Sequence, residues 1–273
     1  MKTNILIIVA FYITTSSCQG EFLNRLSYRV LREFPHDKTA FTQALECIHG
    51  TNCEEMLEST GQYGQSSGRR VRTRTGKVRE SIGLESNFFG EGDAVGKNVK
   101  RVYQLTWKER KAIIYEKKEG SDMKRIGVKK WECSEEGWGL TNNGTHLISS
   151  DGTSMLRWVD PKTMKVVMEK RIHWRDGRQT WLMNEIELVN GNIWANLFTS
   201  TEIVRIDLST NRVSGVIDFT DLVRANSGEN AENVLNGIAF NEATGTFFIT
   251  GKNWLKMYEV EILSKSGNTK VEL

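Results

Sequence analysis

A unit of about 45 to 55 residues recurs along this chain, and a repeat of that length strongly limits the folds available to it. In each unit a short polar or aromatic segment runs directly into an alternating, partly apolar stretch typical of a β-strand. Such strand-built repeats are the size of propeller blades, so the sequence predicts an all-β propeller of five units around one central site. Equivalent strand positions in the successive units are Glu58, Gln104, Ile148, Ala195 and Ile249.

Turn-forming segments separate the short strands throughout, as at Asn142-Asn143-Gly144, Asn190-Gly191 and Thr244-Gly245. Only residues 221–233 are compatible with a helical turn or two, and we interpret this stretch as a loop over one face. Hydrophobic residues make up 38% of the 273 residues and charged ones 26%, which indicates a globular protein. Closed all-β architectures commonly reach this length as one domain, and no linker-like composition divides the chain.

The N-terminus has the pattern of a signal peptide. Lys2 supplies a positive charge, an apolar run of about nine residues extends from Ile5 to Ile13, and small polar residues follow. We therefore expect a signal peptide over residues 1–20 and a single domain over residues 21–273, which places the protein in the secretory pathway, secreted or lumenal or vacuolar. The sequon Asn143-Gly144-Thr145 lies in a predicted turn, where glycosylation is sterically feasible.

The cysteines suit that compartment. Cys47 and Cys53 flank a hairpin-like tip, so their side chains could meet across antiparallel strands as a disulfide. A zinc site formed by Cys47, His49 and Cys53 is the alternative, but it lacks a fourth ligand at a useful spacing. Cys133 is expected to be a small buried thiol, because no histidine lies near it in the sequence.

The net charge of +3 is too small to indicate a nucleic-acid partner. The basic run from Arg69 to Lys77 has the pattern of a strand and a turn with outward, solvated cations, with a patch for an anionic partner as the alternative. No aromatic residues alternate with these cations to stack on bases.

Many ordered motifs resemble the plant-type glutaminyl-peptide cyclotransferases, or glutaminyl cyclases, over about residues 30 to 262. A lone Gly-Glu-Gly would be weak support, whereas this many motifs in order are specific. They include Phe34-Pro35-His36-Asp37, Ala40-Phe41-Thr42-Gln43, Phe89-Gly90-Glu91-Gly92, Gly137-Trp138-Gly139-Leu140, Asn184-Glu185, Trp194-Ala195-Asn196, Leu235-Asn236-Gly237 and Thr250-Gly251-Lys252.

The resemblance implies a five-bladed β-propeller whose site lies at the entrance of a central channel. It also implies a reaction in which the α-amine of an N-terminal glutamine attacks its own side-chain carboxamide, forms pyroglutamate and releases ammonia. The partners would be peptides or proteins with an N-terminal glutamine, bound by a monomer with no membrane attachment after signal cleavage. No catalytic metal or other cofactor is implied, although a structural ion in the channel is compatible with the resemblance.

Glu91 matches the catalytic acid of the family, and we assign it as the proton shuttle. Its neighbour Phe89 would remove water from the carboxyl group and raise its pKa toward the working range. Lys252 matches a lysine near the carboxamide oxygen, where an ammonium group would stabilise developing negative charge.

Further pocket positions follow from the same resemblance. The substrate-binding residues that it implies are Phe41, Gln43, Phe89, Trp107, Trp138, Asn184, Phe198 and Lys252. Taken without the resemblance, the aromatic residues would more often be core, Asn184 a turn former and Lys252 a solvated strand end. Asn236 and Glu58 are placed second, as channel-wall or structural hydrogen-bonding residues.

Two positions depart from the family pattern. Phe198 stands where the family has tryptophan, which removes an indole N–H donor, and Ala44 stands where it has glycine, which would strain a turn that requires positive φ. Neither change removes a proton-transfer group, so activity is expected to survive. An inactive propeller acting as a secreted peptide-binding module remains the alternative. A metal-dependent lactonase is disfavoured, because the channel-facing tips offer a single strong acid.

Overall fold

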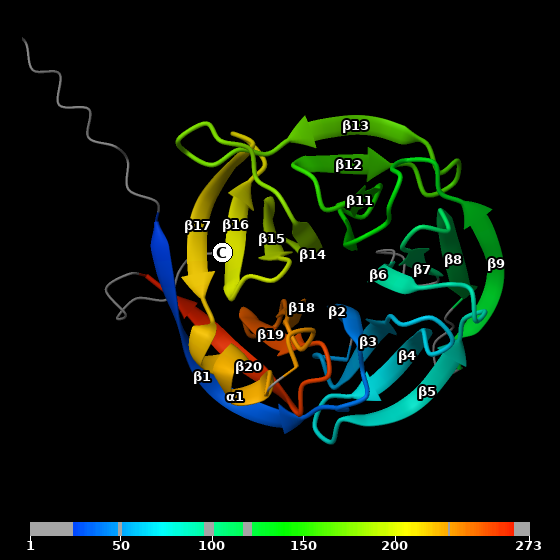
Figure 1. The fold of residues 1–273 in the computed structure, drawn as a ribbon, viewed down its shortest axis with the longest axis horizontal. Coiled ribbons are helices and arrows are strands. Elements are labelled where there is room, and N and C mark those ends of the chain that lie inside the picture. The colour runs from blue at the N-terminus through cyan, green and yellow to red at the C-terminus, as the bar shows by residue number, and fades with distance from the viewer. Residues whose placement is uncertain (1–23, 49–50, 96–100, 117–121, 229, 265–273) are drawn as a thin grey trace, which may run out of the picture.

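The computed structural model describes residues 24–48, 51–95, 101–116, 122–228 and 230–264. Within these ranges the chain forms β-strands and one short helix, α1 (Thr220–Asn226), which lies in the stretch interpreted as a loop. Antiparallel sheets surround a common centre like the blades of a propeller (Figure 1), so the predicted all-β propeller is confirmed. None of the helical residues in this part of the chain forms a helix long and apolar enough to cross a membrane.

Three units are separate four-stranded sheets whose strands follow one another in chain order. The first contains β2 (Thr42–Cys47), β3 (Glu55–Thr60), β4 (Ser67–Arg72) and β5 (Lys77–Gly83). The second contains β6 (Gly90–Val95), β7 (Arg101–Thr106), β8 (Lys111–Glu116) and β9 (Lys124–Lys130). The third contains β10 (Leu140–Asn142), β11 (Leu147–Ser149), β12 (Met155–Val159) and β13 (Val166–Arg171).

The remaining strands form one eight-stranded sheet in the order β14-β15-β16-β17-β1-β20-β19-β18. One half contains β14 (Met183–Val189), β15 (Asn192–Leu197), β16 (Glu202–Asp207) and β17 (Arg212–Asp218). The other contains β18 (Leu235–Asn241), β19 (Thr246–Gly251), β20 (Lys256–Leu263) and the N-terminal strand β1 (Arg25–Pro35). A short parallel contact between β1 and β17 joins the halves, so the number of units is five when the sheet is divided at that contact.

The repeat positions read from the sequence occupy the same place in each unit. Glu58, Gln104, Ile148, Ala195 and Ile249 lie on β3, β7, β11, β15 and β19, the second strand of each successive unit. The first strands β2 and β6 are buried along their whole length, whereas β5, β9 and β13 alternate or are exposed at the outside (Figure 1). The first two units therefore bury their first strands at the centre and face solvent with their last, whereas β17, the last strand of the fourth unit, is largely buried.

Buried carboxylates connect the innermost strands of different units. Glu185 accepts hydrogen bonds from the backbone N–H of Leu45 (3.2 Å) and of Ile238 (2.8 Å), and Glu46 accepts one from Val95 (2.6 Å). Because these strands do not pair edge to edge, the carboxylates satisfy backbone donors that face the centre.

The expectation of a single strong acid near the channel is therefore wrong. Glu46, Glu185 and Asp93 lie buried on the innermost strands β2, β14 and β6, and burial raises the pKa of all three, that of Asp93 to about 8. No group of three or more His, Cys, Asp or Glu side chains with the geometry to hold a metal occurs in the described ranges.

Cys47 and Cys53 form a disulfide, as predicted, while His49 of the alternative zinc site lies outside the described residues, as does the predicted signal peptide. Cys133 is a buried thiol whose pKa burial raises to about 11. The basic run does form a strand and a turn, β4 and the start of β5, but not with solvated cations throughout. Arg69 and Arg70 are only 7% and 6% exposed, because carboxylates of neighbouring strands pair with them.

Candidate active site

One cavity of about 360 Å³ contains all nine residues that the sequence nominates for the site. It also contains three that the sequence analysis did not single out, Gln62, Tyr63 and Glu232. The full lining is Phe41, Gln43, Gln62, Tyr63, Phe89, Glu91, Trp107, Trp138, Asn184, Phe198, Glu232 and Lys252.

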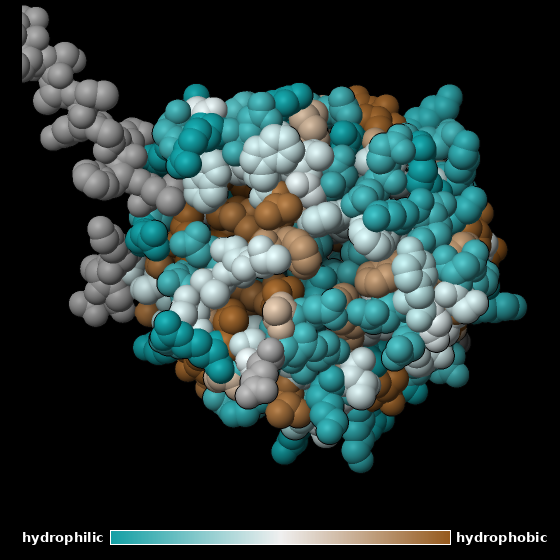
Figure 2. Space-filling view, in the orientation of Figure 1, coloured by the Kyte–Doolittle hydropathy of each residue, from teal (hydrophilic) through white to brown (hydrophobic). Residues whose placement is uncertain are grey.

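Two kinds of position supply these residues. One set lies at or just before the start of a first strand, as Gln43 does on β2, Glu91 on β6 and Asn184 on β14. The other follows the end of a second strand, as Trp107 does after β7 and Lys252 after β19. First and second strands are antiparallel in each unit, so both sets meet at one end of the propeller. In Figure 2, hydrophobic side chains lie among polar ones around the middle of the visible face, and hydrophilic ones cover much of its periphery.

Glycines allow the first strands to approach closely at this end. A Cβ atom on Gly139 would lie 2.1 Å from the backbone oxygen of Asn184, and one on Gly92 would lie 2.4 Å from the nitrogen of Leu140. The Gly-Glu-Gly and Gly-Trp-Gly segments are therefore packing requirements between neighbouring units as well as parts of the site.

Glu91 is the most deeply placed carboxyl group of the cavity, with 5% of its surface exposed. Its Oε1 accepts a hydrogen bond of 2.9 Å from Nε2 of Gln43. Burial raises the pKa of Glu91 well above the usual range; the charge of Lys252 opposes this shift, while Glu136 and Glu109 add to it. The raised pKa favours the protonated form of this carboxyl group, which is what a proton donor requires.

Asn236 orients the side-chain amide of Gln43 by a hydrogen bond. Nδ2 of Asn236 lies 3.3 Å from Oε1 of Gln43 and also donates to the backbone oxygens of Thr42 (3.0 Å) and Gln43 (3.2 Å). Asn236 is completely buried and is not among the lining residues, which agrees with a supporting position. An amide nitrogen carries two hydrogens, so Nε2 of Gln43 has one more donor besides the hydrogen bonded to Glu91.

Aromatic rings form two walls. On one side Phe89 contacts Phe41, Tyr63 and Trp107, with ring centroids 6.0, 5.4 and 5.6 Å apart. On the other, Trp138 and Phe198 meet edge to face at 5.7 Å. The indole N–H groups of Trp107 and Trp138 both donate to Oε2 of Glu136, at 2.8 and 2.9 Å, so the indole rings are tied together across two units.

Lys252 occupies the space between these walls. Its Nζ lies 4.6 Å from the centroid of the Phe41 ring and 5.0 Å from that of Phe198. Burial lowers the pKa of Lys252 to about 8, although the charges of Glu91 and Glu232 favour the ammonium form. Lys252 is thus a buried cation inside the cavity and not a solvated strand end.

Glu58 stands apart from the cavity. It is fully buried, and its carboxylate contacts His36, Thr42 and Arg69. Burial alone would raise its pKa, but the charges of His36 and Arg69 lower the pKa of Glu58 to about 2. Glu58 is therefore ionised at neutral pH, which fits the structural hydrogen-bonding role expected for it from the sequence.

The departures from the family pattern have different outcomes. Ala44 lies within β2 and is not one of the residues with positive φ, so its methyl group does not strain a turn. Phe198 lies in the cavity and keeps an aromatic face toward Trp138 and Lys252.

Comparisons with known proteins identify the family of the chain. The chain is 38% identical over 245 residues to the glutaminyl-peptide cyclotransferase of Arabidopsis thaliana, a match that covers 88% of this chain and 73% of that protein. The crystal structure of Myxococcus xanthus glutaminyl cyclase superposes with a TM-score of 0.79 at 34% identity, covering 89% of this chain and 99% of that one. The family model described as glutamine cyclotransferase matches residues 4–262, and the chain belongs to that family.

Proposed function

We propose that this cavity binds the N-terminal glutamine of a peptide or protein and converts it to pyroglutamate with release of ammonia. The observation that carries the proposal is a buried carboxyl group, Glu91, within a cavity that also holds a buried ammonium group, Lys252. Membership of the family supports the same reaction.

In the proposed reaction the α-amino nitrogen of glutamine attacks Cδ of its own side chain, and the carbonyl oxygen gains negative charge. Lys252 stabilises that oxygen as an ammonium donor. Glu91 accepts the proton that the attacking nitrogen loses and delivers a proton to the side-chain nitrogen, so that the Cδ–Nε2 bond breaks and ammonia leaves. An α-amino group has a pKa of about 8, and the raised pKa of Glu91 reduces the free-energy cost of the transfer.

The remaining side chains hold the glutamine in a folded conformation. The two aromatic walls enclose the aliphatic part of the side chain, and the amides of Gln43 and Asn184 bind its polar atoms. Closing the lactam needs the amine and carboxamide held about 3 to 3.5 Å apart, which such a box provides. This chain's own side chains perform every step, and the mechanism that we propose involves no catalytic metal. Every group in it comes from one chain, so we propose a monomeric enzyme.

We also propose that the protein acts in the secretory pathway. The disulfide between Cys47 and Cys53 suits an oxidising compartment. Asn143 is exposed on the turn between β10 and β11, which suits the attachment of a glycan.

The decisive test is ammonia release from a purified protein and a Gln-initiated peptide, with the same peptide carrying an acetylated N-terminus as control. We expect one molecule of ammonia per peptide and a product whose mass is lower by the mass of ammonia. The acetylated peptide should not react, because its N-terminal nitrogen is no longer nucleophilic. Binding without ammonia release would instead indicate a peptide-binding module.

Phe198→Trp tests the pocket at the position that departs from the family. An indole in place of the phenyl ring adds stacking area and an N–H donor, and one such contact is worth about 1 kcal/mol. KM for a Gln-peptide is therefore expected to fall by up to about tenfold, with kcat nearly unchanged, because the contact exists in ground and transition states alike. Steady-state kinetics would decide, and a lower kcat would mean that the pocket is shaped around phenylalanine.

A further inference from the structure

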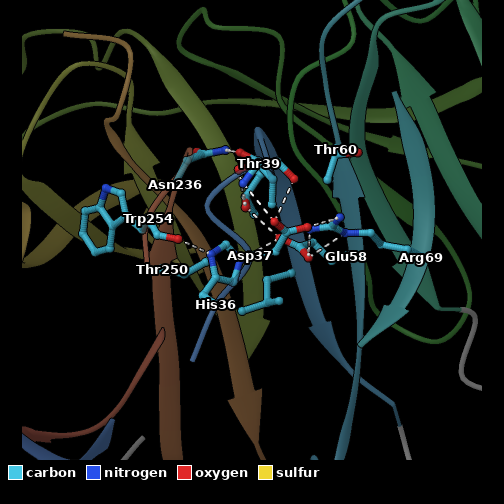
Figure 3. A network of polar contacts seen from close by, with 12 residues as sticks. His36, Asp37, Thr39, Glu58, Thr60, Arg69, Asn236, Thr250 and Trp254 are labelled. Atoms are coloured by element: carbon cyan, nitrogen blue, oxygen red, sulfur yellow. Dashed lines mark hydrogen bonds and ion pairs between the residues drawn. The ribbon is translucent and has the colours of Figure 1, made fainter. Parts of the chain in front are cut away.

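A buried charged network lies beside the cavity, where the chain passes from β1 of the last unit into β2 of the first (Figure 3). His36 occupies this crossing, between the turn that joins β19 to β20 and the strand β3. Its side chain is 3% exposed, and its two side-chain hydrogen bonds are to Trp254 and Glu58, neither of which lines the cavity.

Both ring nitrogens of His36 face hydrogen-bond acceptors. Nδ1 lies 2.8 Å from the backbone oxygen of Trp254, which can only accept. Nε2 lies 2.9 Å from Oε1 of Glu58, whose other oxygen is 2.9 Å from Nε and from Nη2 of Arg69. The guanidinium keeps the carboxylate ionised, so this group also only accepts. Two acceptors require two N–H donors, and only the imidazolium form of histidine supplies both.

The carboxylate of Glu58 extends the network to the β2 side of the cavity. Thr42 donates its hydroxyl to Oε1 of Glu58 at 2.7 Å, and Thr42 stands between the lining residues Phe41 and Gln43. Arg69 is held in turn by Asp37, 3.0 Å away. Glu58, Arg69 and Asp37 are the charged groups that face His36 from β3, β4 and its own segment.

The other end of the network reaches the turn that carries Lys252. Trp254, whose oxygen binds His36, is two residues from Lys252. The backbone reinforces the contact, because Asn253 N donates to Ala40 O (2.7 Å) and His36 N donates to Leu255 O (2.9 Å). The His36 imidazolium thus connects two segments that line the cavity. One carries Phe41 and Gln43, and the other is the turn that carries Lys252.

We propose that His36 is a positioning residue of the glutaminyl cyclase reaction, held as an imidazolium that fixes Lys252 relative to Gln43 through Trp254, Glu58 and Thr42. The kinetic test of this proposal rests on the proposed function, whereas the test of His36 protonation does not.

The pKa of His36 agrees with the geometry. Burial alone would lower it, but the charge and hydrogen bond of Glu58 and the carbonyl of Trp254 raise the pKa of His36 above its usual 6.5. A raised pKa means that the folded state binds the proton more tightly than the unfolded chain. The stabilisation is therefore fully present below about pH 6.5 and is lost as the pH rises through the folded-state value.

The first experiment reads protonation without reference to activity. Nitrogen-15 histidine spectra of the wild type at pH 7.5, about one unit above the usual pKa, should show His36 with hydrogen on both ring nitrogens. The His36→Gln spectrum identifies the signal by its loss. A neutral His36 ring at this pH would overturn the proposal, whatever the enzyme's activity.

The second experiment uses two adjacent arginines as a matched pair. Arg69 and Arg70 are both buried on β4 and paired with carboxylates, but Arg70 binds Glu55 (2.5 Å) and Glu80 (3.5 Å), which lie outside the network. Arg69→Gln and Arg70→Gln should both lower Tm. Only Arg69→Gln, together with His36→Gln, should reduce kcat/KM, by about 10- to 100-fold, because a misplacement of about 1 Å can cost that much.

Two further readouts separate positioning from general destabilisation. The Tm difference between the wild type and His36→Gln should be largest near pH 6 and shrink at higher pH, as the sign of the linkage requires. If Arg70→Gln reduced kcat/KM as much as Arg69→Gln at matched Tm loss, destabilisation alone would explain the effect and positioning by His36 would be refuted. A wild type without ammonia release would defeat the proposed function, and the His36 spectrum would still decide its protonation.

Discussion

Glu91→Gln is expected to lower kcat by about 10² to 10⁴-fold while leaving peptide binding in place, since general acid–base catalysis typically contributes that much. Glutamine keeps the size of the side chain, and its amide oxygen still accepts the hydrogen bond from Nε2 of Gln43. It cannot exchange a proton at neutral pH, so the amine stays protonated longer and ammonia leaves without its proton donor. Ammonia release and peptide affinity, measured on the same preparation, would show the two effects separately.

Glu58→Gln is the matched control for this prediction. Both carboxyl groups are buried, but Glu58 is ionised within the His36 and Arg69 network and lies outside the cavity. The variant should therefore lose more thermal stability than Glu91→Gln and less turnover, because it disturbs the position of Lys252 and Gln43 without removing the proton shuttle. If folded Glu91→Gln kept near-normal turnover while Glu58→Gln were inactive, the proton shuttle would have been assigned to the wrong group.

The repeat could be read from the sequence because a propeller places equivalent residues at equivalent strand positions. The five positions chosen from Glu58 to Ile249 all lie on second strands, although their side chains range from charged to aliphatic. Pattern and spacing, and not residue type, carried that information. The seven-residue helix α1 was harder to see, because a helix of two turns depends on tertiary packing more than on propensity.

The cavity could be assembled for the same reason. Residues that follow second strands converge, so Trp107, Phe198 and Lys252 meet residues from the starts of β2, β6 and β14. Gly61 occupies the corresponding place after β3, and Tyr63 reaches the cavity from two residues further along, so the same rule would have pointed to this segment but not to Tyr63 itself. Glu232 could not be found by this rule, because it lies in the long connection between β17 and β18, whose path is not set by the repeat.

The environment of charged residues was the least predictable feature. The sequence pattern predicts that Arg69 and Arg70 lie on a solvated strand, but both side chains are buried. Their carboxylate partners come from other strands and from the segment after β1. Glu46 and Glu185 likewise face the centre, where they bind backbone donors of neighbouring units. Such pairings join residues distant in sequence, and local alternation contains no information about them.

A chain ending at Asn253 is expected to give no soluble protein, because it cannot close the ring of sheets. The deletion removes β20, which pairs antiparallel with β1 on one side and β19 on the other. Without it β1 loses its main partner, and both strands expose unpaired edges that favour aggregation. Four buried apolar side chains of β20 are also lost, Met257, Tyr258, Val260 and Ile262.

The energy involved is large enough to decide the outcome. Four buried apolar side chains contribute about 6 to 12 kcal/mol, which is comparable with the whole stability of a typical domain, about 5 to 15 kcal/mol. A chain ending at Ser264 keeps β20 and is the control, expected to be soluble and active. Soluble yield, size-exclusion chromatography and circular dichroism would compare the two. A monomeric, folded protein ending at Asn253 would show that β1 can close the ring without β20, contrary to the sheet order seen here.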